Sequence, residues 1–130
     1  MSYSLKIGDG IFLEKPDRYS ISHLWLVITE PFGDPPKVII VNLTTQRDGS
    51  DTTVVLGAGD HPYVTHPSVV FFADARDVEV NHLERLVALD GSRLHGDPCS
   101  DELLTSIRDG LLESSFTPRK IKKLFSNSCL

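Results

Sequence analysis

Residues 38–47 read VIIVNLTTQR, an almost unbroken aliphatic run that changes abruptly into hydroxyl, amide and guanidinium side chains. A short apolar run bounded by turn residues is typical of a buried β-strand, and the β-branched residues Val and Ile favour that structure. The polar end of the run, with Thr44, Thr45 and Arg47, passes into the turn sequence QRDGSD at residues 46–51. The stretch therefore predicts a core strand that ends in a group of polar side chains.

Four further short segments have the same β-rich character, and they cover residues 11–13, 24–29, 52–56 and 69–73. The segments between them contain most of the prolines and glycines, which end regular pairing. Parallel neighbours need a crossover of a dozen or more residues, and no long helix separates these segments. We therefore predict a small, strongly bent antiparallel barrel of about five strands.

The pattern becomes helical after Asp74. Residues 78–89, VEVNHLERLVAL, predict a short helix or turn after the last strand. Ser100 is suited to cap a second helix with one apolar stripe, formed by Leu103, Leu104, Ile107 and Leu111. Thr117 and Pro118 predict the start of a third helix, with Ile121, Leu124 and Phe125 on its apolar side. We expect a barrel over residues 1–97 and a helical extension over residues 98–130, packed as a single domain.

Composition and charge limit the classes of function. The chain has 130 residues, enough for one domain, and a formal net charge of −5. Phosphate affinity rests on clustered Lys and Arg, so an acidic chain needs a local basic patch to bind nucleic acid. The one dense cluster is Arg119, Lys120, Lys122 and Lys123. We see no secretory signal, and the apolar runs are too short to span a membrane, so we expect a cytoplasmic protein without membrane contact.

Six quoted stretches, in this order and spacing, resemble the MazF/PemK/Kid family of toxin proteins. They are IGDGIFLE (7–14), HLWLVIT (23–29), VIIVNLTTQR (38–47), VVLGAGDHPYVTHPSVVFFADARDV (54–78), LERLV (83–87) and CSDELLTSIRDGLL (99–112). The resemblance covers roughly residues 6–112. It implies a mainly β fold with C-terminal helices, namely an SH3-like barrel of the CcdB/MazF/PemK type. It further implies a homodimer that cuts single-stranded RNA without a metal or other cofactor and is held inactive by an antitoxin protein.

The resemblance also points to particular residues and to one departure. His23 matches the family His at the start of the second strand, and Thr44 and Thr45 match its Ser/Thr element. The Arg that usually follows the His is replaced by Leu24, so the chain lacks the expected catalytic cation there. Attack of a ribose 2′-OH on phosphate needs a proton acceptor, a proton donor and a positive group. We therefore assign Arg47 to the positive group.

The predicted catalytic residues are thus His23, Thr44 and Arg47, and the predicted substrate-binding residues are Thr45, His61, Tyr63 and Arg76. Each has an alternative. Arg47 can pair with Asp48 or Asp51 in its own turn, and Arg76 can form a structural pair with Asp74 on the same face of a strand. His23 can be an ordinary histidine at the end of a strand.

Residues 59–68, GDHPYVTHPS, contain two His-Pro pairs and Asp60, the one tight group of candidate metal ligands. Pro holds each preceding His extended, which separates the two rings, so we favour an architectural lead-in to the next strand over a metal site. His61 and Tyr63 then line the edge of a groove centred on His23 and Thr44. Two other functions stay open: a catalytically inactive barrel that binds a protein partner, and nucleic-acid binding without cleavage through residues 118–123.

Overall fold

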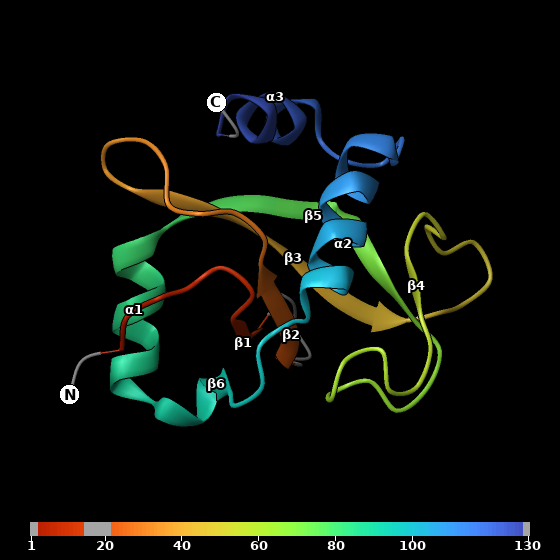
Figure 1. The fold of residues 1–130 in the computed structure, drawn as a ribbon, viewed down its shortest axis with the longest axis horizontal. Helices are drawn as coiled ribbons and strands as arrows, with labels where there is room; N and C mark the ends of the chain where they lie inside the picture. Colours follow the sequence, from red (N-terminus) through yellow and green to blue (C-terminus); the bar gives the residue numbers. More distant parts are fainter. Residues whose placement is uncertain (1–2, 15–21, 129–130) are drawn as a thin grey trace.

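The computed structural model describes residues 3–14 and 22–128, and its centre is an antiparallel sheet that curls into a half-barrel (Figure 1). The six strands of the described residues lie in the order β4-β5-β3-β2-β1-β6. Their bounds are Gly10–Glu14 (β1), Ser22–Val27 (β2), Lys37–Thr45 (β3), Val55–Leu56 (β4), Ser68–Glu79 (β5) and Leu94–His95 (β6). The helices are Val80–Leu89 (α1), Asp101–Glu113 (α2) and Arg119–Ser128 (α3), with a 3₁₀ turn at Gly91–Arg93. The predicted mainly β fold with C-terminal helices is confirmed.

Two predicted strands have different lengths in the structure. The segment 52–56 forms a strand only over Val55–Leu56, whereas the segment 69–73 extends to Ser68–Glu79. The extension occurs because the polar residues of β5 continue to pair with β3, in a register that joins Lys37 to Glu79. The two-residue strand β6, which the sequence did not predict, pairs with β1 at the edge of the sheet.

Strand β3 is aliphatic throughout because both of its faces are covered. Ile39, Val41 and Leu43 belong to a core that includes residues of α2 and α3, and Val38 and Ile40 belong to a second core with residues of α1. Alternate residues of a strand point to opposite faces of the sheet. The two cores therefore lie on opposite sides of β3, which explains why its sequence does not alternate.

Helix α2 begins as predicted and packs closely on the sheet. The side chain of Ser100 accepts a hydrogen bond from the backbone N–H of Leu103, so it is the N-cap. A Cβ atom at Gly110 would come within 2.5 Å of Val54 and 3.0 Å of Phe72. The absence of a side chain at Gly110 thus allows α2 to approach β5.

Helix α3 begins at Arg119, and the predicted cap at Thr117 was wrong. The Thr117 hydroxyl is buried and has no hydrogen-bond partner among the described residues, while the carbonyl of Pro118 accepts from Ile121 and Lys122. The apolar side is as predicted, since Ile121 and Phe125 are buried. Across residues 3–14 and 22–128, none of the helices combines the length and the apolar character needed to cross a bilayer.

The loop between β4 and β5 is held by a cluster of rings. His61 is 1% exposed, and its ring centroid lies 5.3 Å from that of His95 in β6. Tyr63 contacts Phe12 of β1 edge to face, with 5.5 Å between the centroids. The Nδ1 atom of His61 accepts a hydrogen bond from the backbone N–H of Tyr63 at 3.0 Å. These contacts join the loop to β1 and β6.

A buried hydrogen-bond network joins the end of α2 to the loop between β3 and β4. The Ser114 hydroxyl donates to Asp51 Oδ2 at 2.6 Å and accepts from the backbone N–H of Phe116 at 3.1 Å. Thr53 donates to Asp51 Oδ1 through both its hydroxyl and its backbone N–H. Burial alone raises the pKa of the Asp51 carboxyl group, but the hydrogen bonds from Ser114 and Thr53 outweigh burial and lower it.

We predict that Ser114→Ala lowers the free energy of unfolding by about 1.5–3 kcal/mol, the range for a hydrogen bond to a charged group. The loss arises because a buried oxygen of Asp51 would lose its donor. Urea unfolding measures it, and Ser115→Ala, at an exposed position next to Ser114, is the control and should change little. Equal losses in the two variants would contradict this account of the network.

The buried His61 predicts acid sensitivity. Burial and the neighbouring His95 lower the pKa of the His61 imidazole, against a smaller opposite effect of Asp97. The unfolded chain then binds a proton more readily than the folded one, so stability is full above about pH 6.5 and falls as the pH decreases below that value.

We therefore expect wild-type protein to lose stability between about pH 7.5 and about pH 5.5, and His61→Asn to lose less. The amide oxygen of Asn can still accept the Tyr63 N–H but binds no proton. Urea unfolding at the two pH values measures the difference, and His82→Asn, at an exposed position on α1, is the matched control. The same pH dependence in His61→Asn and wild type would refute the role of His61.

Candidate functional site

Three strand ends surround a surface hollow of about 410 Å³. They are the start of β2, the end of β3 and the start of β5, and the loop between β4 and β5 closes the remaining side. The side chains of interest in its lining are His23, Thr44, Thr45, Arg47, Tyr63 and His66. Five of the seven residues predicted from the sequence therefore lie in one place.

The pairing of the strands explains this convergence. In β3 and β5, Thr44 lies opposite Val69 and Thr45 opposite Ser68. In β2 and β3, Trp25 lies opposite Asn42, and the same register continued by two residues brings His23 toward Thr44. Because antiparallel neighbours run in opposite directions, the polar end of β3 meets the beginnings of both adjacent strands.

His66 is the histidine most firmly tied to the end of β3. Its Nε2 atom lies 3.0 Å from the Thr45 hydroxyl oxygen, and its Nδ1 atom lies 3.4 Å from the hydroxyl oxygen of Thr65. The backbone N–H of Gln46 donates to the carbonyl of Pro67 at 3.1 Å, which fixes the loop to the strand. An exposed imidazole is thus held beside a hydroxyl group at the rim of the hollow.

Sequence reasoning missed this role of His66, which it considered only as a metal ligand. The pairing of the two apolar runs VNLTT and SVVFF would have revealed it, because Thr45 opposite Ser68 brings the residues before Ser68 alongside the end of β3. The metal site itself is not formed by these residues. Asp60 accepts the backbone N–H of Gly57 at 2.7 Å, and His61 lies among the rings described above. Within residues 3–14 and 22–128, no three His, Cys, Asp or Glu side chains are gathered to hold a metal ion.

Arg47 occupies the first position of the turn after β3. Its backbone N–H donates to the Ser50 hydroxyl at 2.8 Å, and its carbonyl accepts from the Ser50 N–H at 3.1 Å. Gly49 has a φ of 82°, a left-handed conformation that favours glycine and closes this turn. The predicted alternative, in which Arg47 pairs with Asp48 or Asp51, is not observed among the ion pairs of the described residues. The guanidinium group is exposed to solvent beside the hollow.

Tyr63 and His61 lie at different depths. Tyr63 is 43% exposed and lines the hollow. His61 is buried behind it and does not line the hollow, and its Nε2 atom has no hydrogen-bond partner among the residues that the structure describes. The geometry therefore gives Tyr63 access to a ligand, whereas His61 supports the wall of the hollow.

Arg76 is separate from the other predicted residues. Its guanidinium carbon lies 4.7 Å from the centroid of the Trp25 ring, and its Nε atom donates to the backbone carbonyl of Asp74 at 3.3 Å. It lines another hollow, of about 220 Å³, together with His82 and Arg93. The prediction that Arg76 and Asp74 are close is consistent with this contact, but Arg76 does not reach the hollow at the end of β3.

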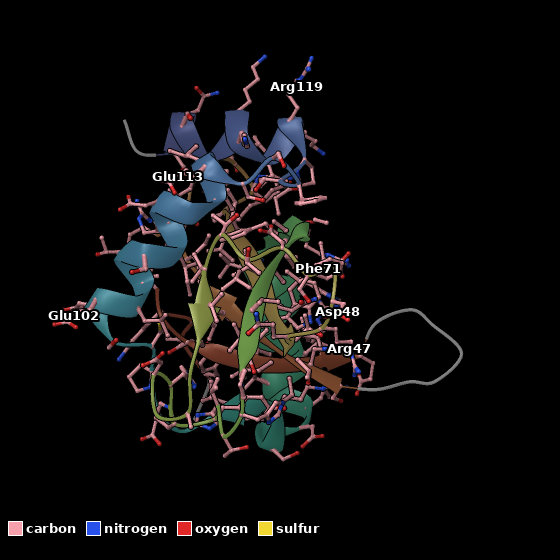
Figure 2. All side chains as sticks on the ribbon, turned by 90° about the vertical axis from the view of Figure 1, so that its right-hand side faces the viewer. Arg47, Asp48, Phe71, Glu102, Glu113 and Arg119 are labelled. Carbon is pink, nitrogen blue, oxygen red and sulfur yellow. The ribbon has the colours of Figure 1, made fainter. Side chains whose placement is uncertain are left out.

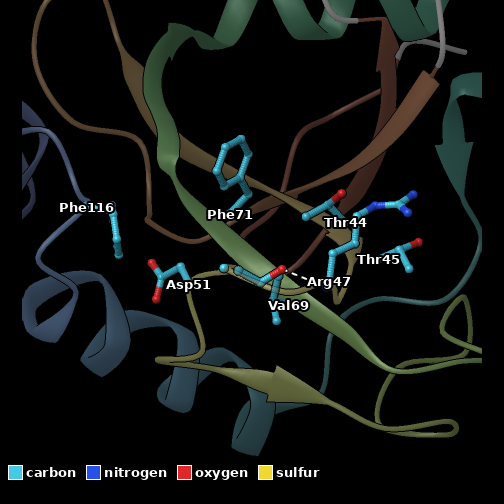
Figure 3. Close-up of a pocket in the computed structure, with 9 residues that line it drawn as sticks. Thr44, Thr45, Arg47, Asp51, Val69, Phe71 and Phe116 are labelled. Atoms are coloured by element: carbon cyan, nitrogen blue, oxygen red, sulfur yellow. Dashed lines mark hydrogen bonds between the residues drawn. The ribbon is translucent and has the colours of Figure 1, made fainter.

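A smaller hollow of about 200 Å³ adjoins the first and shares Thr44, Thr45 and Arg47 with it. Its other side is apolar, with Val69 and Phe71 of β5 and with Phe116, which follows α2 (Figure 3). Figure 2 shows Arg47 and Phe71 on one side of the molecule, with Glu102 and Glu113 of α2 on the other. The two hollows thus form one continuous surface around the end of β3.

This surface combines two imidazoles, a guanidinium group and two threonine hydroxyls. Imidazoles as a class titrate near neutral pH and exchange protons, and a guanidinium group binds phosphate oxygens through several N–H donors. The arrangement suits transfer of a proton to or from a bound phosphate ester. No protein-family model matches the chain, and no curated protein gives a significant match to it.

Proposed function

We propose that this chain is a MazF/PemK-like toxin of a toxin-antitoxin system, built on an SH3-like barrel, and that it cuts single-stranded RNA without a metal. The observation that carries the proposal is the convergence of His23, His66 and Arg47 on one hollow at the end of β3. The order of sequence motifs that resembles the toxin family supports it independently. The curled antiparallel sheet is compatible with the barrel of that family.

The reaction begins with attack of a ribose 2′-OH on the adjacent phosphate. A base takes the proton of the 2′ oxygen while an acid gives a proton to the departing 5′ oxygen, which leaves a 2′,3′-cyclic phosphate and a 5′-hydroxyl group. Two imidazoles on one hollow, His23 and His66, supply an acceptor and a donor. Each step is balanced by these two groups, so the mechanism needs no further reactant.

Thr45 positions one member of this pair. Its hydroxyl oxygen, 3.0 Å from His66 Nε2, restricts rotation of the ring and keeps that nitrogen at the end of β3. Thr44 lines both hollows and offers a second hydroxyl group to a phosphate oxygen. Tyr63 lies at the rim, where its ring can contact the ribose or base beside the scissile bond.

Arg47 takes the place of the missing family cation. The family position is occupied by Leu24, which is 0% exposed in the core under α2, so no charged side chain is available there. Arg47 follows the same strand end that carries Thr44 and Thr45, and a planar guanidinium group can bind two oxygens of the phosphorane. The charge is therefore supplied from the turn after β3.

The same proposal includes a homodimer, a cytoplasmic location and an antitoxin protein as partner. One observation favours a second function, a catalytically inactive barrel that binds a protein: the family Arg is replaced by Leu24. In that case the hollow would recognise side chains of the partner and would carry out no chemistry.

We expect purified wild-type protein to cut single-stranded RNA in the presence of EDTA and to produce 2′,3′-cyclic phosphate ends. His66→Ala, His23→Ala and Arg47→Ala should each reduce the rate by about a hundredfold or more, because each removes a proton-transfer group or the stabilising charge. Gel analysis of a labelled RNA measures the rates. His82→Ala, an exposed histidine outside the hollow, is the matched control and should cut at the wild-type rate.

Undiminished cleavage by His66→Ala would exclude the proposed mechanism and would indicate a contaminating nuclease. No cleavage by wild type would reject the enzyme and favour the protein-binding alternative. That alternative then requires that wild type and the double variant His23→Ala with Arg47→Ala retain the same protein partner in a pull-down. Loss of the partner in the double variant would place the contact in this hollow.

A further inference from the structure

We propose that the smaller hollow beside Arg47 is a stacking site for the nucleobase next to the scissile phosphate. The inference rests on the proposed function, because it takes the phosphate to bind at Arg47, Thr44 and His66. It adds a second part of the substrate, the planar base, and assigns it to Phe116 and Phe71.

The first reason is the composition and size of the hollow. Val69 and Phe71 alternate with Val70 and Phe72, which are buried in the core under α2, so the first pair faces the opposite side of β5. Phe116 adds a ring that is 58% exposed. A hollow of about 200 Å³ with two aromatic rings in its lining is on the scale of one heterocyclic base.

The second reason is that Phe116 is exposed yet firmly held. Its backbone N–H donates to the Ser114 hydroxyl, and that hydroxyl donates to the buried Asp51. The ring therefore projects from a backbone that is fixed to the loop between β3 and β4. An exposed phenylalanine on a fixed backbone loses little conformational freedom when it binds a flat ligand.

The third reason is the position of charge. Arg47 and Thr44 line both hollows, so a phosphate bound at their groups has the imidazoles on one side and the phenylalanine rings on the other (Figure 3). A nucleotide has the same sequence of parts, with an anionic phosphate next to an apolar base. A membrane or a purely apolar peptide does not match a guanidinium group between the two hollows.

The site should favour bases over no base, with little choice among them. The Asp51 oxygens, which could otherwise read the donors of a base, already accept from Ser114 and Thr53. Stacking on aromatic rings tolerates every base because each has a π-face. Recognition at this position is thus expected to depend on the presence of a base and not on its identity.

The test measures binding separately from cleavage. Fluorescence anisotropy compares two labelled probes, a short single-stranded 2′-O-methyl RNA of mixed sequence, which lacks the attacking hydroxyl, and its abasic counterpart. Phe116→Ala should weaken binding of the first probe by about five- to a hundredfold and leave binding of the abasic probe unchanged. Phe116→Trp should retain binding of the first probe. Leu112→Ala, 45% exposed on α2 and outside both hollows, is the matched control.

Equal affinities of wild type and Phe116→Ala for the base-containing probe would overturn the stacking site, as would equal losses on both probes. These results leave the nuclease proposal intact if wild type still cuts RNA. Conversely, base-dependent binding through Phe116 in a protein that cuts no RNA would support the stacking site and reject the nuclease. A wild-type protein that binds neither probe would overturn the inference.

Discussion

The coverage of β3 on both faces is the constraint on which the rest of the structure depends. One face packs against α2 and α3 and the other against α1, so every residue from Val38 to Leu43 must be compatible with burial. Asn42 is the exception, and its amide nitrogen donates to Asp74 at 3.3 Å beside the irregularity in register between Ile40 and Asn42. The cover ends at Thr44. Polar side chains first become possible there, and the candidate site lies at that boundary.

The same constraint explains how much of the fold could be predicted. A strand buried on both faces leaves a continuous aliphatic run, so Val38–Leu43 was evident from the sequence. The second half of β5 was missed because ADARDVE contains charged residues, and only its register with β3 identifies it as a strand. The cap at Thr117 followed a sound local rule, but the hydroxyl is buried where α3 meets the body of the protein. Tertiary packing decided both cases.

The candidate site was predictable where its residues belong to strand ends and less so where they belong to loops. His23, Thr44 and Thr45 follow from the sequence because antiparallel pairing brings their strand ends together. His66 and Phe116 could not be placed in this way. Their positions depend on long-range contacts, the pairing of Thr45 with Ser68 and the hydrogen bond between Asp51 and Ser114, which separate parts of the chain provide.

The buried Leu24 connects the fold to the proposed chemistry. A charged side chain at this position would have to enter a core in which Leu24, Leu26 and Ile28 are fully buried, and the loss of solvation would exceed what a partner could restore. A cation for the phosphate must therefore come from outside β2. The turn after β3 can supply it, because Ser50 and Gly49 fix the backbone of Arg47 while its side chain remains in solvent. The interior thus determines which element carries the charge, and the turn determines its position between the imidazoles and the aromatic rings.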